Sequence, residues 1–136
     1  MALMIRVAAA LIFDKQGNFL IAERAHGKLA GKWEFPGGKI EAGETEEQAV
    51  AREIQEELGI SVAPKKIVGV FSHTYAEQEV ELALVRCSPF DDSQKIISDG
   101  SHAAHAWVQF SDCENYDFAP LDHEIVDFLK QATENN

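Results

Sequence analysis

The chain has 136 residues, of which 46% are hydrophobic and 26% are charged, and these values are typical of one globular domain. Its formal net charge of −11 argues against a broad binding surface for a nucleic acid polymer or an anionic membrane. A small anionic ligand is compatible with this charge if metal ions bridge it to the protein. Two cysteines far apart in sequence, Cys87 and Cys113, predict reduced thiols and a cytoplasmic location. We expect a single domain over residues 1–136.

The first third of the chain predicts strands and turns. Ile5–Phe13 is an apolar run followed by turn residues, and Phe19–Ala22 is the expected returning strand. The loop Glu23–Lys32 gathers several cations, which are Arg24, His26, Lys28 and Lys32. It is either a solvated loop or a contact for phosphate or base, and the sequence favours neither. A short strand at Trp33–Phe35 then enters the turn Pro36–Gly38, where glycine lets the backbone approach a ligand closely.

A helix is predicted to begin just after Thr45. Thr45 and Gln48 fit a capping box, and Gly59 is placed for a left-handed C-cap. At 100° per residue one apolar stripe emerges, made of Val50, Ala51, Ile54 and Leu58. The stripe predicts that the helix packs on a sheet.

Three glutamates of this helix, Glu53, Glu56 and Glu57, are spaced i, i+3 and i+4 and meet on a neighbouring face. Their mutual repulsion is unfavourable unless a positive group binds, and a hard divalent cation with oxygen ligands is the obvious candidate. Taken alone, the cluster is more simply a solvated helix face. The residues around it decide between the two interpretations.

The second half of the chain predicts a hairpin, a loop and another strand. Ile67–Tyr75 and Val80–Cys87 are strands joined through residues 76–79. Ser88–Gly100 is a loop with room for a short strand at Lys95–Ile97, and Ala104–Phe110 is the next strand.

The C-terminal region predicts helices. Ser111–Glu114 fits a second capping box and a short helical turn, and Asp122 is placed to cap a last helix. The buried stripe of that helix is predicted to contain Ile125, Val126, Leu129 and Ala132. This order of elements predicts an α/β or α+β fold, in which helices flank a mixed sheet.

The spacing around the glutamates resembles the signature of the Nudix hydrolases at every defined position. The matching residues are Gly38, then after five residues Glu44, then after seven Arg52-Glu53-Ile54, then after one Glu56-Glu57, and after one Gly59-Ile60. The preceding Trp33-Glu34-Phe35-Pro36-Gly37-Gly38 resembles the entry strand of the MutT-like and CTP pyrophosphohydrolase-like subfamily. The resemblance implies the Nudix α/β/α sandwich.

The same resemblance implies hydrolysis that depends on Mg²⁺, for which Mn²⁺ can substitute. The implied metal ligands are the carbonyl of Gly37 and the carboxylates of Glu53, Glu56 and Glu57. Glu53 is alternatively the base for water. Arg52 is expected to hold the glutamates by ion pairing, and Glu44 to support the loop and helix. For these two, an ordinary surface charge and a helix N-terminal acid are the alternatives.

One position departs from the family pattern. Relatives often carry a further metal-binding glutamate just before a histidine, and here Ser101 takes that place before His102. Asp99 or a water could fill the gap. His102 is a candidate for contact with phosphate or metal, but a lone histidine is more often structural. His105 is interpreted as structural.

Candidate substrate contacts also follow from the resemblance. In relatives, the position of Asp122 carries a side chain that reads the base. An ionised carboxylate can only accept hydrogen bonds, so it favours base edges rich in N–H donors, as in cytosine or guanine. The alternative is an N-cap without ligand contact. Phe35 and Tyr75 are candidates to pack against the base and Arg24 to reach base or phosphate, though each also fits the core or a surface loop. The backbone of Gly38 is expected beside the substrate.

The resulting hypothesis is an enzyme that converts a nucleoside triphosphate to the monophosphate and pyrophosphate. The resemblance implies a housecleaning role on 8-oxo-dGTP or on cytidine nucleotides. A second hypothesis keeps the reaction but takes a nucleoside diphosphate derivative, such as ADP-ribose or a dinucleoside polyphosphate. The third, a non-catalytic binding module, is disfavoured because every glutamate of the signature is present. Monomer and homodimer stay open.

Overall fold

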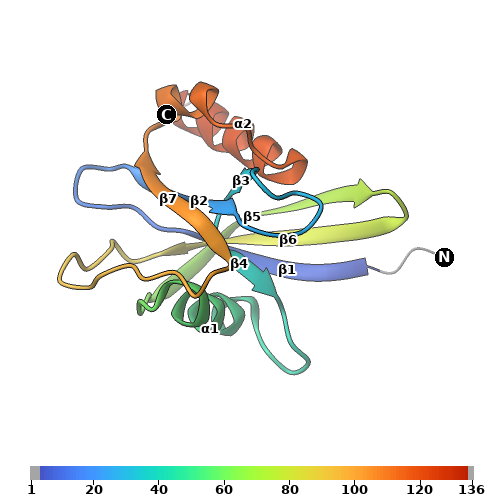
Figure 1. The fold of residues 1–136 in the computed structure, drawn as a ribbon, viewed down its shortest axis with the longest axis horizontal. Coiled ribbons are helices and arrows are strands. Elements are labelled where there is room, and N and C mark those ends of the chain that lie inside the picture. Colours follow the sequence, from blue (N-terminus) through green and yellow to red (C-terminus); the bar gives the residue numbers. More distant parts are fainter. Residues whose placement is uncertain (1–3, 135–136) are drawn as a thin grey trace.

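The strands form two sheets with a helix on either side (Figure 1). The computed structural model describes residues 4–134, so the parts of our predictions that concern residues 1–3 and 135–136 lie outside the described residues. The larger sheet has the order β4-β1-β6-β5, and the smaller one has the order β3-β2-β7. The strands are β1 (Met4–Leu11), β2 (Phe19–Arg24), β3 (Trp33–Glu34), β4 (Gly37–Lys39), β5 (Pro64–Tyr75), β6 (Gln78–Cys87) and β7 (His102–Val108).

The larger sheet is mixed, as predicted. Strand β1 runs parallel to β6, from the pair Met4↔Glu79 to the pair Leu11↔Arg86, while its other neighbour β4 is antiparallel. Strands β5 and β6 form the predicted hairpin, but the turn is tighter than expected, because Tyr75 already pairs with Gln78. Only two residues connect the strands, and Ala76 takes a positive φ of 53° to close the turn.

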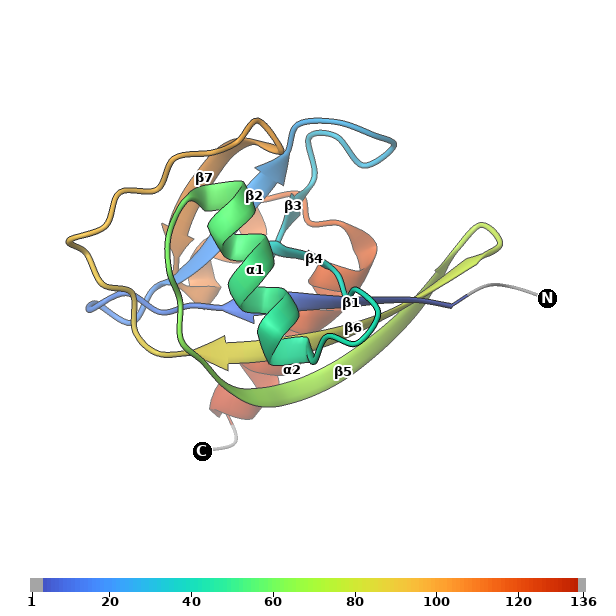
Figure 2. The same ribbon diagram turned by 90° about the horizontal axis from the view of Figure 1, so that it is seen from below.

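Helix α1 (Glu46–Leu58) begins and ends as its sequence predicts. Thr45 is the N-cap of a complete capping box, and Gly59 ends the helix with a φ of 68°. One position of the predicted stripe is wrong: Ala51 is only partly buried, whereas Ala49 is fully buried. The buried face packs on β1, β4 and β5, and Figure 2 shows α1 lying across this face of the molecule.

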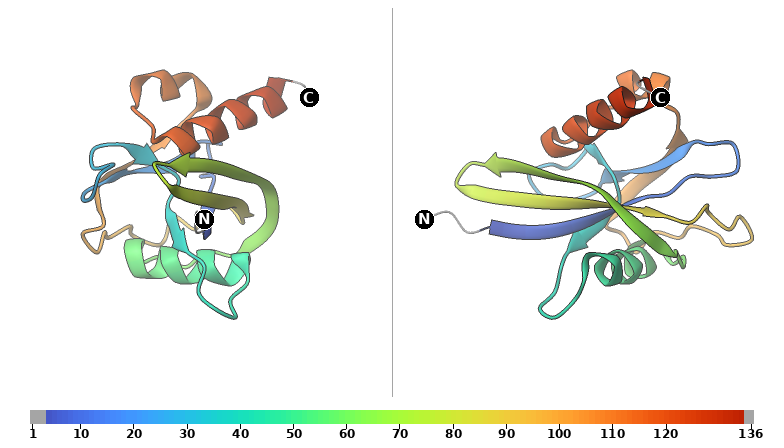
Figure 3. Two further views of the ribbon diagram at one scale, coloured as in Figure 1. Left: turned by 90° about the vertical axis from the view of Figure 1, so that its right-hand side faces the viewer. Right: turned by 180° about the vertical axis from the view of Figure 1, so that it is seen from behind.

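The opposite side is covered by the 3₁₀ helix η1 (Phe110–Asn115) and by α2 (Pro120–Glu134), as Figures 1 and 3 show. The predicted helical turn is therefore confirmed, but the capping box expected at Ser111–Glu114 is wrong, because the turn starts at Phe110 with Gln109 as N-cap and Asp112 as its partner. The α/β/α sandwich is confirmed as well, since both helical layers enclose the sheets. Ala132 was predicted to be buried but is exposed, because the last turns of α2 extend past the sheet (Figure 3).

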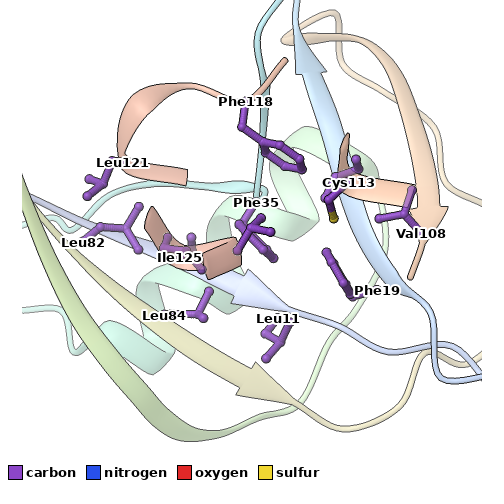
Figure 4. Packing of buried hydrophobic residues seen from close by; sticks show 13 residues of the cluster. Leu11, Phe19, Phe35, Leu82, Leu84, Val108, Cys113, Phe118, Leu121 and Ile125 are labelled. Carbon is purple, nitrogen blue, oxygen red and sulfur yellow. The ribbon is translucent and has the colours of Figure 1, made fainter. Parts of the chain in front are cut away.

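Two hydrophobic clusters fill the space between these layers. One lies under α2 and contains Phe19, Phe35 and Ile125, which Figure 4 shows side by side with Leu84. The rings of Phe19 and Phe35 stack with their centroids 5.6 Å apart. The second cluster lies under α1. Each large side chain buried here contributes about 1.5–3 kcal/mol relative to its exposed state, so both helices are held mainly by apolar contact.

Three local predictions are corrected by tertiary contacts. Residues 95–97 are not a strand; instead the N–H groups of Ile97 and Asp99 donate to carbonyls at the C-terminal end of α1. Gly37–Lys39, predicted to begin in a turn, is the strand β4 against β1. Helix α2 begins at Pro120, because proline has the φ of a first helical residue and has no N–H to satisfy.

Candidate active site

An open pocket of about 1130 Å³ lies between the sheets and is lined by residues from both halves of the chain. Helix α1 contributes Glu53 and Glu57, β3 contributes Glu34, and the start of α2 contributes Asp122. The positions of these four carboxyl groups span residues 34 to 122 of the sequence. The fold is therefore what brings them to one pocket.

Glu57 lies in a concentration of negative charge. Burial is the main cause that raises its pKa to about 9, and the hydrogen bond with Glu53 and the charges of Glu53, Glu34 and Asp99 act in the same direction. Its side chain is only 13% exposed. A carboxyl group so placed is neutral at pH 7 unless a cation joins it, and a bound cation would restore its charge.

Arg52 joins the acids of this region into one network. Its guanidinium donates to both carboxylate oxygens of Glu44, at 2.7 and 2.9 Å, and to Oε1 of Glu53 at 2.8 Å. A further bond of 2.9 Å reaches the carbonyl of Lys39. These bonds raise the pKa of Arg52, and with the N–H of Glu41 they lower that of Glu44 to about 2. Arg52 thereby ties α1 to the loop that precedes it.

The two glycines of the predicted turn are required by close contacts. A Cβ atom at Gly38 would overlap the carboxyl group of Glu53, and one at Gly37 would overlap the backbone of Ala8 on β1. At Gly37 only glycine lets β4 approach the backbone of β1 so closely, whereas a side chain at Gly38 would displace the carboxyl group of Glu53. The backbone of both glycines consequently lines the pocket beside Glu53 and Glu57.

Asp122 lies in the first turn of α2 and is 5% exposed. Its Oδ1 accepts a hydrogen bond of 2.9 Å from the backbone N–H of Phe35. Burial, and next the charge of Glu34, raise its pKa to about 8. The N-cap interpretation is therefore wrong, since Asp122 is the third residue of α2 and its carboxyl group bonds to the segment between β3 and β4. The raised pKa favours the neutral acid at pH 7, whereas the prediction for Asp122 assumed an ionised carboxylate.

The sequence itself matches a known family. A model of the NUDIX domain family matches residues 3–129. This chain belongs to the NUDIX family. The match covers nearly the whole chain, and the glutamates discussed above lie inside it. The predicted membership of the Nudix hydrolases is confirmed.

Individual relatives support this membership. The CTP pyrophosphohydrolase of Escherichia coli is 34% identical over 127 residues, which are 91% of this chain and 90% of that protein. The 8-oxo-dGTP diphosphatase of Proteus vulgaris is 41% identical over 80 residues, which are 58% of this chain and 71% of that protein. The crystal structure of the MutT protein from Methanosarcina mazei superposes with a TM-score of 0.86 at 28% identity, covering 99% of this chain and 97% of that one.

The structure of this Nudix protein separates the three glutamates of the signature. Glu53 and Glu57 line the pocket, whereas the side chain of Glu56 is 57% exposed, lies 3.3 Å from Arg52 and does not line the pocket. Within residues 4–134, no group of three or more histidine, cysteine or acidic side chains is arranged to enclose a metal ion.

Two of the predicted substrate contacts, Phe35 and Tyr75, line the pocket. Phe35 is 2% exposed and is also a member of the core cluster under α2. The ring of Tyr75 lines the pocket, and its hydroxyl accepts a hydrogen bond of 3.1 Å from the N–H of Leu121. This bond satisfies one of the free N–H groups at the start of α2.

The cations of the loop before β3 divide into two groups. Arg24, His26 and Lys28 line the pocket, whereas Lys32 lies 2.6 Å from Asp117, in an ion pair. Arg24 also lies 3.7 Å from Glu34. The pocket therefore has a cationic side as well as an acidic one.

Sequence reasoning missed Glu34 and left His102 undecided. Nε2 of His102 lies 3.0 Å from Glu34, and its Nδ1 lies 3.6 Å from Glu57. The signal for Glu34 was its place between Trp33 and Phe35, next to the glycine turn.

His105 is exposed on β7. Asp99 accepts a hydrogen bond from the N–H of Ser101, which lowers its pKa, and both residues are exposed.

Proposed function

We propose that this Nudix protein hydrolyses a nucleoside triphosphate to the monophosphate and pyrophosphate with a divalent metal ion, Mg²⁺ or Mn²⁺. The observation that carries the proposal is the placement of Glu53 and Glu57 in one pocket with the Gly37–Gly38 backbone. The named activities of the two relatives, on CTP and on 8-oxo-dGTP, support the same reaction class. A small nucleotide is the partner, and two buried free cysteines fit a cytoplasmic location.

The residues of the pocket fit a divalent cation. The raised pKa of Glu57, which burial and like charges cause, falls when a cation binds beside the group. Glu53, Glu57 and the carbonyl of Gly37 would hold the ion, with Glu56 as a ligand that must turn inward from the helix surface. When bound, such an ion neutralises phosphate charge and lowers the pKa of a water molecule.

The remaining steps belong to the protein's own side chains. Arg52 holds Glu53 at 2.8 Å, so the carboxylate is oriented to bind metal or to take a proton from the attacking water. Glu44 keeps Arg52 in place through two hydrogen bonds. Arg24 and Lys28, on the cationic side of the pocket, are placed to attract the phosphates.

Asp122 is proposed to contact the base. With Oδ1 bonded to Phe35, the second oxygen is left for the ligand, and in the neutral acid a hydroxyl both donates and accepts. Such a group suits the donor and acceptor edge of cytosine. Because the likeness to the CTP pyrophosphohydrolase spans 91% of this chain and that to the Proteus 8-oxo-dGTP diphosphatase spans 58%, we rank cytidine triphosphates first and 8-oxo-dGTP second.

A substrate panel with Mg²⁺ tests the proposal. It contains CTP, dCTP, GTP, dGTP, 8-oxo-dGTP, ADP-ribose and a dinucleoside polyphosphate, and kcat/KM and the products are measured for each. We expect pyrophosphate and a nucleoside monophosphate from the triphosphates, and no turnover in excess EDTA. Turnover in EDTA would refute the metal mechanism, whereas preferred cleavage of ADP-ribose or the dinucleoside polyphosphate would move the substrate to the second hypothesis.

A further inference from the structure

His102 lies among the carboxylates of the pocket with one ring nitrogen unpaired. The residue is 6% exposed. Among residues 4–134, its Nδ1 is the buried side-chain nitrogen or oxygen for which no hydrogen-bond partner exists. The nearest acidic oxygen to that atom is Oε2 of Glu57, at 3.6 Å, which is too far for a good hydrogen bond. A buried polar atom without a partner requires an explanation.

The other ring nitrogen fixes the orientation of the imidazole. Nε2 lies 3.0 Å from Oε2 of Glu34, and a carboxylate at this distance takes a hydrogen bond from N–H. In the neutral ring, the lone pair of Nδ1 then points toward Glu57. At 3.6 Å the two atoms are too far apart to satisfy each other, and a cation between them would be bound by both.

A metal ion satisfies both atoms at once. Histidine ligands of metals regularly donate their second ring N–H to a carboxylate, which sets the tautomer and raises the basicity of the ligating nitrogen. Glu34, His102 and Glu57 have this order here, with Glu34 as the outer carboxylate. Adjacent ligands of one ion, each about 2.1 Å from it, are separated by about 3 to 3.5 Å, close to the observed 3.6 Å between Nδ1 and Glu57.

We propose that Nδ1 of His102 is a direct ligand of the divalent ion held by Glu57, and that Glu34 orients this histidine from the other side. The inference rests on the proposed function, because the ion is the one proposed for catalysis. Ser101, the residue before His102, is exposed and offers no carboxylate. An imidazole in the ligand set favours Mn²⁺ and Co²⁺ over Mg²⁺ more strongly than an all-oxygen site does.

The test is pulsed electron paramagnetic resonance on the Mn²⁺-loaded protein without nucleotide, which detects directly bound ¹⁴N. We expect a nitrogen coupling in the wild type and in the control His105→Gln, which changes the exposed histidine of the same strand. His102→Gln, which keeps an amide N–H for Glu34 but lacks Nδ1, should lose the coupling and bind Mn²⁺ about tenfold or more weakly. Circular dichroism is used to check that His102→Gln is folded.

The wild-type spectrum alone decides the inference, even if His102→Gln does not fold. Bound Mn²⁺ without nitrogen coupling would overturn it and would favour a protonated imidazole paired with both Glu34 and Glu57. If the same preparation then releases pyrophosphate from nucleotides with Mg²⁺, the proposed function stands while the ligand assignment fails. If nitrogen coupling is present but no nucleotide in the panel is cleaved, the ligand assignment stands and the proposed function fails. A protein that binds no Mn²⁺ would refute both.

Discussion

Helices α1 and α2 lie on opposite sides of the sheets (Figure 1). Each contributes one carboxyl group to the same pocket, the partly buried Glu57 from α1 and the buried Asp122 from α2. Burial is the main cause of the raised pKa of both, to about 9 and about 8. Around Glu57 every other influence is a carboxylate and raises the pKa further. Around Asp122 the N–H of Phe35 and the charge of Arg24 act in the opposite direction.

This difference determines what each carboxyl group can bind. A carboxyl group among like charges gains most from a cation, which all the acids can share. A single buried acid that already accepts a backbone hydrogen bond is satisfied by a proton, and it then presents a hydroxyl group to a ligand. The α1 side of the pocket is thus suited to metal, and the α2 side to a base.

The largest expected effect is that of Glu57→Gln. Because the amide cannot supply the charge that a divalent ion needs, we expect kcat to fall by at least about a hundredfold, as when a main electrostatic element is removed. The fold should persist, since the substitution keeps the shape of the side chain. Glu47→Gln, on the same helix but outside the pocket, is the control. Near-normal turnover of Glu57→Gln would mean that the cluster is only a solvated face.

Asp122→Asn is expected to change the choice of base rather than the rate for every substrate. The amide oxygen must stay with the N–H of Phe35, so the amide nitrogen takes the place of the second oxygen and can only donate. A cytosine amino group then loses its acceptor. We expect the ratio of kcat/KM for CTP to that for 8-oxo-dGTP to fall by about tenfold. An unchanged ratio would show that Asp122 does not read the base.

The wild type and Asp122→Asn together also test the protonation state of Asp122. A folded-state pKa of about 8, against about 3.9 in the unfolded chain, means that the folded protein binds the extra proton between these values. The free energy of unfolding should therefore decrease as the pH rises from about 4 to about 8, by up to about 1.4 kcal/mol per pH unit. Urea unfolding of the metal-free wild type, minus that of Asp122→Asn, isolates this slope. A flat difference would show that Asp122 is ionised throughout.

The smallest effect is expected for Tyr75→Phe. The substitution keeps the ring in the pocket and removes the hydroxyl that accepts the N–H of Leu121. We expect a loss of about 1 kcal/mol in the free energy of unfolding, the usual contribution of one hydrogen bond. Tyr116→Phe is the matched control, because the hydroxyl of Tyr116 forms no hydrogen bond with any residue between 4 and 134. Equal stability of the two variants would mean that the start of α2 does not depend on Tyr75.

Much of the α1 side was predictable because its interactions are local. The capping box joins Thr45 to Gln48, and the glutamates are neighbours within one or two helical turns. Contacts of this range depend on residues a few positions apart, so the sequence pattern carries them directly. The family signature lies in the same stretch and extended the prediction from a helix to a hydrolase.

The α2 side was predicted in part and corrected in part. Asp122 was predicted to contact the base, and it lines the pocket, but its hydrogen bond with Phe35, which is 87 positions away, was not predicted. Its burial also depends on the whole cluster under α2, and a side chain's pKa cannot be inferred without its surroundings. Strand β4 was missed for a related reason, since two glycines in three residues suggest a turn until β1 is placed beside them.

The sequence by itself determined most of the strands, the capped helix α1, the spacing of Glu53, Glu56 and Glu57, and membership of the NUDIX family. Each of these depends on short-range patterns. Only the tertiary structure decided that Glu53 and Glu57 face the pocket while Glu56 lies outside it. It alone paired His102 with Glu34, 68 positions away, and left Nδ1 facing Glu57. Such pairs arise from the packing of sheets and helices, and the physical quantities that govern them, burial and the distance between charges, exist only once the chain has folded.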